Sequence, residues 1–426
     1  MEDGETASSS SSSPSSMLHP PSSSSSHVQR TSTLNDLIRA VFLAASWTWV
    51  IGMFLPVLLV REYGVWAWVI FAIPNCVGAA AMGWVLRTRE QSRDLVAAHR
   101  VACRAFSLVT IAFHVFVVGW IILPWMNWKG WLPGMFLFVF AFLTMRTSGV
   151  GLAALLTYIY SLVCAALFLS ESGGNVVSSV PQPAGVIAMS LAALVPVCVF
   201  GFALNPYLDL TFHAARQASP TPRSSKIAFG VGFCVLFFAM ICFTLAYSGV
   251  LWRDILYSAV NNRPPPSEST VWFVVGHILF QSAFTAGIHA ASVTSGDGNR
   301  RAATPMQWIG VLIAFAIGAA GAWWANKNVY RGEMLAGELV YRLFMSFYGL
   351  VFPGYAWICM LPSWRNPHRP TRRSLAVFAA AVLFAAPFYW MAFIGRRMGW
   401  AMVGVGIVLL ARFAVSAGRR AEGDSA

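Results

Sequence analysis

Long apolar stretches, separated by short polar ones, follow one another along almost the whole chain after residue 36. A stretch of about 18 residues can cross the hydrocarbon core of a membrane as a helix. About twelve are expected: Leu37–Val60, Tyr63–Leu86, Ala102–Leu123, Leu132–Met145, Gly149–Leu169, Ala184–Asn205, Ile227–Leu251, Val271–Ala291, Met306–Ala325, Leu339–Leu361, Leu375–Ile394 and Met398–Val415. The pattern predicts an all-α, polytopic membrane protein, because the alternation typical of membrane β-barrels is absent from the sequence.

The chain divides into three parts. Residues 1–34 are rich in Ser and Pro and bury too little apolar surface to fold, so a disordered cytoplasmic tail is expected. Residues 35–362 hold the first ten predicted helices. Residues 363–426 hold two accessory helices, expected as a tight hairpin, and a C-terminal tail.

Composition and charge agree with a membrane protein. Hydrophobic residues make up 57% of the chain and charged residues 11%, against about 25% charged in a soluble domain. The net charge of +13 would point to nucleic acid in a soluble protein, but the basic residues lie in short loops between apolar stretches. They favour one side by roughly two to one. This predicts cytoplasmic N- and C-termini in the plasma (inner) membrane, and no nucleic-acid partner.

The sixth predicted helix contains residues that interrupt helices. Within Val195–Arg216 the interrupting residues are Pro196, Gly201, Asn205 and Pro206, and Pro206 has no amide hydrogen to donate. A polar run follows at once. The segment is therefore either a plain helix end or a break at membrane depth, which is tolerated only where protein or a cavity covers it.

Leu37–Val60, five helices earlier, has a similar character. Ser46 and Thr48 place hydroxyls in mid-membrane, and Gly52 and Pro56 weaken the helix just beyond them. Such hydroxyls either bond to carbonyls of their own helix or face a polar site. Two weakened helices at matching places indicate an internal repeat.

A stripe of polar side chains marks the eighth predicted helix: Gln281, Ser282, Thr285, His289 and Ser292. The stripe must face protein or water rather than lipid. Its hydroxyls either ligate a hard cation such as Na⁺, together with loosened carbonyls, or bond to neighbouring helices. On this helix, His277 and His289 are stronger candidates for function than His114 on the third.

No enzyme or ATPase motif stands in the sequence: it has no phosphate-binding loop, no His-Glu-x-x-His and no Gly-x-Ser-x-Gly. An enzyme is therefore not expected, nor a cofactor apart from Na⁺ as a coupling ion. The 7 cysteines lie in apolar segments without ligand-type spacing, which predicts buried free thiols.

Three stretches together resemble the sodium:solute symporter family. They are Ala44–Arg89 with Ala-Ser-Trp-Thr-Trp, Gly201–Gly232 with Gly-Phe-Ala-Leu-Asn-Pro-Tyr, and Val340–Pro362 with Tyr-Gly-Leu-Val-Phe-Pro-Gly. Gly149–Tyr160 is more faintly similar to a fourth family motif, with Tyr158 in place of its acidic residue. The matches keep the family's order over most of residues 37–395.

The resemblance implies the leucine-transporter type of fold, a five-plus-five inverted repeat with two helices added. It implies a substrate site between the broken first and sixth helices, formed by Trp47, Trp49, Gly201, Phe202 and Asn205. It also implies a cation site between the first and eighth helices, carried over to Ala45, Thr48, Ser282 and Thr285.

The sequence thus predicts a secondary active transporter that couples a small organic solute to Na⁺ or H⁺ in the lipid bilayer by alternating access. A non-transporting membrane sensor or scaffold with the same fold is the alternative. Gln281-Ser282 and Phe284-Thr285 favour it, because the family has two adjacent hydroxyl residues there. A membrane enzyme would need a catalytic cluster that the sequence does not contain.

Overall fold

The computed structural model describes residues 24–122, 149–172, 188–256, 269–294, 304–328, 330–331, 334–363 and 367–423, with positions 135 and 139. Apart from helices and their connections, these ranges contain one hairpin of two-residue strands, β1 (Tyr330–Arg331) and β2 (Met334–Leu335). The predicted fourth helix, Leu132–Met145, lies outside the described residues.

Within those ranges, 9 helices are long and apolar enough to cross a membrane, and a bent pair makes a tenth. A shorter apolar helix, Trp400–Val415, stands where the last helix was expected. Each lies at a predicted position, with ends that differ by a few residues. The prediction of an all-α, polytopic membrane protein is confirmed.

The helices of the first half are α1 (Ser24–Trp47), α2 (Val50–Tyr63), α3 (Val65–Val85), α4 (Arg89–Ala98), α5 (Arg100–Val117), η1 (Val118–Ile122) and α7 (Val150–Glu171). Those of the second half are α8 (Ala188–Leu204), η2 (Asn205–Leu208), α9 (Leu210–Ala218), α10 (Pro222–Val231), η3 (Gly232–Phe237), α11 (Phe238–Val250), η4 (Leu251–Leu256), α13 (Ser269–Thr294), α14 (Pro305–Lys327), α15 (Ala336–Ser346), η5 (Phe347–Val351), α16 (Phe352–Tyr355), η6 (Ala356–Met360) and η7 (Leu361–Ser363). The accessory helices are α17 (Arg372–Tyr389), η8 (Trp390–Ile394) and α18 (Trp400–Gly423).

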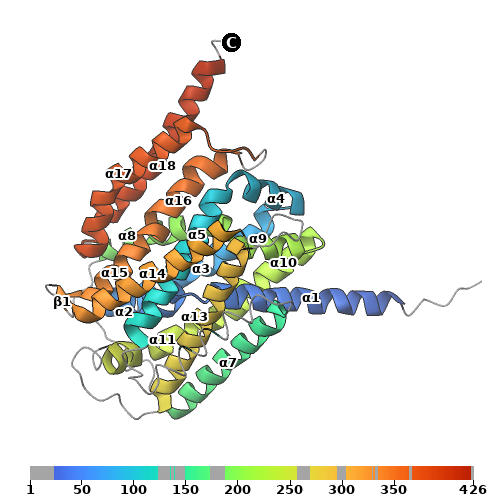
Figure 1. Ribbon diagram of the computed structural model, residues 1–426, viewed down its shortest axis with the longest axis vertical. Coiled ribbons are helices and arrows are strands. Elements are labelled where there is room, and N and C mark those ends of the chain that lie inside the picture. The colour runs from blue at the N-terminus through green and yellow to red at the C-terminus, as the bar shows by residue number, and fades with distance from the viewer. Residues whose placement is uncertain are drawn as a thin grey trace, which may run out of the picture.

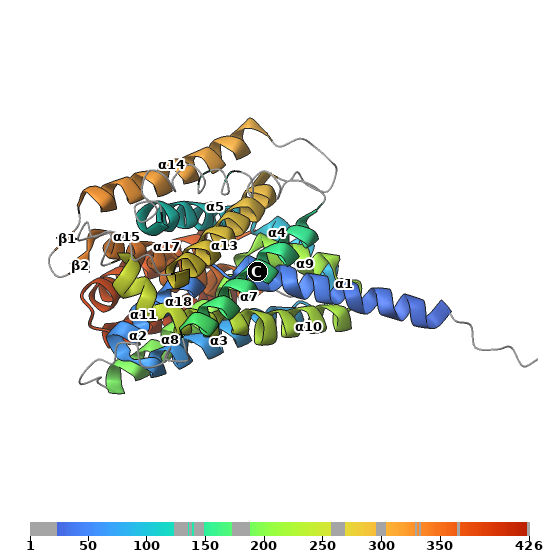
Figure 2. The same ribbon diagram turned by 90° about the horizontal axis from the view of Figure 1, so that it is seen from below.

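The first helix extends beyond its predicted start. α1 begins at Ser24, so residues 24–34 are helical and the prediction of disorder is wrong for them. Once a helix is nucleated, each further residue adds a backbone hydrogen bond, and the polar sequence before Leu37 continues the helix outward. Figures 1 and 2 show this end of α1 projecting from the bundle.

Helix contacts occur in the pairs that a repeat of five helices requires. α1 packs against α10, and their counterparts five spans away, α8 and α3, pack against each other. The contact of α1 with α7 has its counterpart in that of α8 with α16. The contact of α7 with α13 has its counterpart in that of α15 with α5. This packing agrees with the predicted inverted repeat.

Glycines allow close contacts between spans. A Cβ added at Gly78 in α3 would lie 2.5 Å from the carbonyl oxygen of Phe202 in α8, so the two helices touch backbone to backbone. A Cβ at Gly318 in α14 would clash in the same way with the carbonyl oxygen of Ala112 in α5. Such small residues let membrane helices gain dispersion energy by close packing.

Connecting segments among the described residues gather in two groups. α4 and α9 come from loops expected on the cytoplasmic side, and they pack against each other. The end of α2, the start of α15 and the link between α17 and α18 meet in a second group. α17 and α18 form the predicted hairpin along one edge of the bundle (Figure 1).

Several spans contain a π-helical turn, whose extra residue leaves a backbone carbonyl without its usual amide partner. These turns are η1, η3, η4, η5, η6 and η8. In η5, side chains of neighbouring spans supply the donors. Asn205 Nδ2 donates to the Tyr348 carbonyl at 2.8 Å, and the Tyr389 hydroxyl donates to the Gly349 carbonyl at 2.8 Å.

Gly78→Ala is expected to destabilise the protein by about 1–3 kcal/mol, because the new methyl group would force α3 and α8 apart. Gly406→Ala in α18 is the matched control. Nothing lies within 4 Å of a Cβ added there, and alanine favours helix, so the stability of that variant should stay equal or rise. Thermal unfolding in detergent compares them, and equal melting temperatures would contradict the close α3–α8 contact.

Candidate functional site

The first membrane span is broken. α1 ends at Trp47 and α2 begins at Val50, with a bend of 54° between the two helices. Trp49 is extended, and its amide donates to the Trp47 carbonyl at 2.8 Å. In a continuous helix that amide would bond to the carbonyl of Ala45. The span is interrupted, as predicted, but at 48–49 rather than at Gly52 or Pro56, and α2 runs unbroken through both of these residues. The interruption leaves the carbonyl of Ala45, a predicted cation ligand, without this helical donor.

Side chains of two other spans form hydrogen bonds with the backbone polar groups at the break. The amide of Val50 donates to Nε2 of His114 in α5 at 3.4 Å, and the hydroxyl of Tyr341 in α15 donates to the Val50 carbonyl at 3.0 Å. Nδ1 of His114 lies 2.7 Å from the Thr110 carbonyl, so the partners assign the ring proton to Nδ1. His114, expected to be the weakest histidine candidate, is thus bonded to the break itself.

The hydroxyls of the first span take the simpler of their two expected roles. Ser46 Oγ donates to the Leu43 carbonyl at 3.0 Å, and Thr48 Oγ1 donates to the Ala44 carbonyl at 2.8 Å. Both bonds stay within α1. A hydroxyl that donates in this way keeps its lone pairs, so the oxygen of Thr48 can still serve as a ligand.

Aromatic rings surround the break. Trp49 is buried against Trp47, Phe106 and Tyr348, with ring centroids 4.3, 5.4 and 5.7 Å away. The indole of Trp47 donates to Oδ1 of Asn75 in α3 at 2.7 Å. Both predicted tryptophans therefore lie in one ring cluster: Trp47, Trp49, Phe106 and Tyr348. Phe106 and Tyr348 were not predicted, because a sequence with 31 Phe and 11 Tyr does not distinguish these rings from packing rings.

The sixth span is not broken at Gly201. α8 runs through this residue to Leu204, and η2 (Asn205–Leu208) then makes one 3₁₀ turn before the extended Asp209. Pro206 lies in the first turn of η2, where a missing amide hydrogen costs no helical bond. Of the two alternatives left open for this segment, the plain helix end is the one found: α8 ends in a buried 3₁₀ turn, and it is not broken at Gly201.

Two of the three predicted residues of this span reach the ring cluster. Asn205 donates to the Tyr348 carbonyl, and a Cβ added at Gly201 would lie 3.2 Å from that same oxygen. The glycine thus serves close approach to η5 rather than a break in α8. The ring of Phe202 instead packs on Phe71 of α3, with centroids 5.2 Å apart, so it faces another helix.

The polar stripe of α13 faces protein, as predicted, and its fully buried members are Gln281, Ser282, Thr285 and His289. Gln281 donates to Ser161 at 2.9 Å, and His289 lies at 3.0 Å from the hydroxyl of Ser107. Among the described residues, the hydroxyls of Ser282 and Thr285 have no hydrogen-bond partner. A buried hydroxyl left unpaired costs about 1–3 kcal/mol, so these two are candidate ligands.

These two hydroxyls belong to the helix that packs on the broken span. Phe284 contacts Phe42 of α1 with centroids 6.4 Å apart, and His289 contacts Trp49 at 5.4 Å. In the sequence, each predicted cation ligand lies within three residues of one of these contacting rings: Ser282 and Thr285 on α13, Ala45 on α1, and Thr48 directly after α1. Hydroxyl and loosened carbonyl oxygens form a donor set that fits a hard cation such as Na⁺.

Five charged side chains form a network where α2, α15 and the α17–α18 link meet: Arg61, Glu62, Glu338, Arg342 and Arg396. Arg61 donates to the two oxygens of Glu338 at 2.8 and 3.1 Å, and Arg342 donates to Glu338 at 2.7 and 3.0 Å. Arg396, whose φ of 54° is left-handed, lies 3.5 Å from Glu62 and from Glu338. We call these five residues the charge network.

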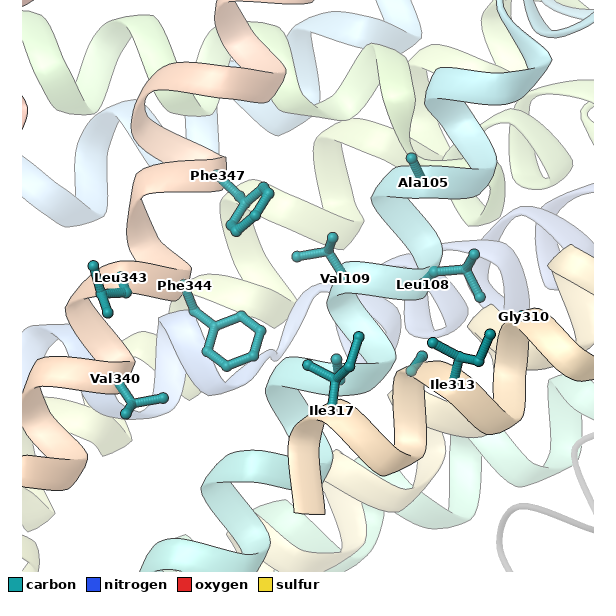
Figure 3. Close-up of a pocket in the computed structure, with 12 residues that line it drawn as sticks. Ala105, Leu108, Val109, Gly310, Ile313, Ile317, Val340, Leu343, Phe344 and Phe347 are labelled. Carbon is teal, nitrogen blue, oxygen red and sulfur yellow. The ribbon is translucent and has the colours of Figure 1, made fainter. Parts of the chain in front are cut away.

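A cavity of about 550 Å³ lies elsewhere, between α5, α14 and the tenth span (Figure 3). Phe344 and Phe347 project toward it from one side, and Ile313 and Ile317 lie on α14 at the other. Its lining is wholly apolar. A solute site needs a few convergent polar groups, so this cavity is not a candidate for it.

No model of a known protein family matches the chain, and no curated protein matches it. Solved structures of Mhp1 do. An inward-facing Mhp1 matches with 13% identity and a TM-score of 0.48, over 90% of this chain and 91% of that one. Mhp1, described as a nucleobase-cation-symport-1 family transporter, closed with bromovinylhydantoin bound, matches with 12% identity and a TM-score of 0.46, over 88% and 91%. The resemblance to sodium:solute symporters stays a prediction.

Asn75→Leu is expected to destabilise the protein by about 1–3 kcal/mol, because the Trp47 indole would keep a buried N–H without an acceptor. Trp47→Phe with Asn75→Leu should cost less than the sum of the two single changes, since no donor is then left unpaired. Thermal unfolding of all four proteins measures this coupling, and strict additivity would argue against the bond.

Proposed function

We propose that this protein is a secondary transporter, which carries a small organic solute across the membrane by alternating access and couples its movement to a cation. The observation that carries the proposal is the broken first span. A backbone break at membrane depth is tolerated where it is covered by protein or lines a cavity, and transporters bind solute and ion at such breaks.

The ring cluster is the proposed solute site. Trp47 and Trp49 lie on the two sides of Thr48 at the break, and the rings of Trp49 and Tyr348 are in contact. The side-chain amide of Asn205 in η2 donates to the backbone carbonyl of Tyr348, so Asn205 adjoins the same cluster. The Oδ1 oxygen of Asn205 is buried without a partner among the described residues, so it is free to accept a hydrogen bond from a solute. Rings with a few polar groups suit a small organic molecule.

The proposed cation site lies beside it, at Ser282 and Thr285 of α13, at Ala45 of α1 and at Thr48, which directly follows α1. Because α1 and α13 both provide ligands, a bound cation would hold the two helices together and favour the arrangement in which they meet. A ligand shifts a conformational equilibrium by its difference in affinity for the two states. Filling this site would therefore change the affinity of the neighbouring solute site.

The charge network is the proposed latch at the end of the bundle predicted to be extracytoplasmic. It ties Arg61 and Glu62 of α2, in the first half, to Glu338 and Arg342 of α15, in the second half. Moving these helices apart would separate Arg61 from Glu338, which are bonded at 2.8 and 3.1 Å, and Glu62 from Arg342. With this latch closed and the ring cluster buried, access to the site from that side is blocked.

Uptake by proteoliposomes tests the proposal directly. A panel of radiolabelled sugars, amino acids and nucleobases is offered with an inward Na⁺ gradient, an inward H⁺ gradient, or neither. Accumulation of one solute class only with a cation gradient is expected. A non-transporting sensor or scaffold predicts solute binding, seen as a higher melting temperature, without any gradient-driven uptake.

Thr285→Ala is expected to lower the apparent affinity for the coupling cation at least about tenfold, because removing a ligand worth about 1.4 kcal/mol has that effect. Ser292→Ala is the matched control on the same helix. Its hydroxyl donates to the Ile288 carbonyl at 2.8 Å, which is a bond within the same helix. Uptake against Na⁺ concentration measures both variants, and equal cation affinities would place the cation elsewhere.

Glu338→Gln is expected to destabilise the closed form by about 3–5 kcal/mol, because Arg61 and Arg342 would lose the buried carboxylate they share. Glu90→Gln on the exposed face of α4 serves as the control, with an expected change within about 0.5 kcal/mol. Melting temperatures in detergent measure the difference. If the melting temperature of Glu338→Gln falls no further than that of the control, the charge network does not stabilise the closed form.

A further inference from the structure

Asp209 stands directly after η2 and caps the start of α9. One carboxylate oxygen, Oδ1, accepts from the amide and from the hydroxyl of Thr211, each at 2.7 Å. The other oxygen, Oδ2, is buried and has no hydrogen-bond partner among the described residues. The whole residue is 0% exposed. A buried carboxylate in this state must gain either a proton or a cation, because its charge has lost its hydration.

The basic side chains of α9 are engaged elsewhere. Nε2 of His213 lies 2.9 Å from the Tyr207 carbonyl, and Nδ1 lies 2.8 Å from the hydroxyl of Ser92 in α4. Arg216 donates to the backbone carbonyls of Leu86 and Arg87. Burial lowers the pKa of His213 to about 4, so this ring is neutral near pH 7 and provides no counter-ion.

The remaining groups around the carboxyl carry no positive charge. The Cys103 thiol of α5 and the Tyr348 hydroxyl of η5 feel the charge of Asp209, and neither is a cation. α1, α4, α13 and η2 also pack on α9, and within the described ranges no charged side chain of theirs acts on this carboxyl. Burial raises the pKa of Asp209 to about 7, although the two Thr211 bonds favour the charged form.

We propose that Asp209 is a proton-binding site, and that release of its proton accompanies opening of the α4–α9 end of the bundle to water. In the closed form described here the carboxyl holds the proton on Oδ2. When water reaches it, the O–H bond breaks, the proton passes to water and the carboxylate is hydrated. The residue lies one turn beyond Asn205 on the same buried segment, and Asn205 donates to the Tyr348 carbonyl.

The direction of the pH effect follows from linkage. The closed form binds its proton with a pKa of about 7, whereas a carboxyl in water has a pKa of about 4. The closed form therefore binds more protons, and low pH favours it. Opening becomes up to about tenfold easier for each pH unit between about 4 and 7, and stays level above that range. This coupling rests on the proposed transport cycle, but proton binding itself does not.

Infrared difference spectroscopy on the full chain in lipid tests the proton site without any solute. Spectra at pH 5 minus pH 8 are expected to contain the carbonyl stretch of a protonated carboxyl that titrates near neutral pH. The band should vanish in Asp209→Asn and persist in Asp94→Asn, a matched change on the exposed face of α4. A band that survives in Asp209→Asn, or its absence from the unaltered protein, would overturn the proposal.

Two further arms keep the test decisive. If Asp209→Asn fails to fold, Thr211→Val serves instead: loss of a hydroxyl that favours the carboxylate should move the midpoint of the band to higher pH, and an unchanged midpoint would count against the assignment. Replacing K⁺ by Na⁺ should leave the band unaltered. Loss of the band in Na⁺ would mean a metal cation site, which contradicts the proposal. Uptake assays decide the transport proposal separately.

Discussion

The structure depends on how it satisfies a backbone that stops being helical inside the hydrocarbon layer. At 49–50 the first span loses regular helical partners: the Trp49 amide bonds to the Trp47 carbonyl, and the amide and carbonyl of Val50 take partners from other spans, because water is not there to supply them. The replacements come from α5, which provides His114, and from α15, which provides Tyr341. The break therefore exists only because the third and tenth spans are held in place around it.

The same helix joins this break to the charge network. Glu338, Tyr341 and Arg342 stand at positions i, i+3 and i+4 of α15, so they share one face of that helix. Tyr341 bonds to the carbonyl at the start of α2, whereas Glu338 bonds to Arg61 near the end of α2. α2 and α15 are thus fastened to each other at two places, which lie eleven residues apart on α2 and three residues apart on α15. Any rotation of α15 acts on both fastenings at once.

Much of this arrangement was predictable from the sequence, because apolar length and helix breakers act locally. The spans and the buried stripe of α13 follow from residue order, and so does the presence of an interruption in the first span, although not its place. For the sixth span the sequence left a helix end and a break open. The structure has the helix end, because glycine weakens an isolated helix but at Gly201 it permits contact with the Tyr348 carbonyl. Local sequence does not distinguish these two uses of glycine.

The side chains that bond to the break could not be predicted from the local sequence pattern. His114 and Tyr341 are separated from Val50 by 64 and 291 residues, and nothing in their own neighbourhoods marks them. The extent of α1 was missed for a different reason. A polar sequence that cannot build a core can still prolong an existing helix, so composition alone underestimated the order of residues 24–34.

The π-helical turn in the tenth span bears on how a membrane helix can move. At η5 the carbonyls of Tyr348 and Gly349 receive hydrogen bonds from the side chains of Asn205 and Tyr389, which belong to other spans. These donors keep the two backbone dipoles paired at a turn that departs from the regular α-helical pattern. The bilayer makes most backbone rearrangement costly, because an unpaired backbone dipole finds no water there. In this protein, side chains of two neighbouring spans supply hydrogen bonds at that turn.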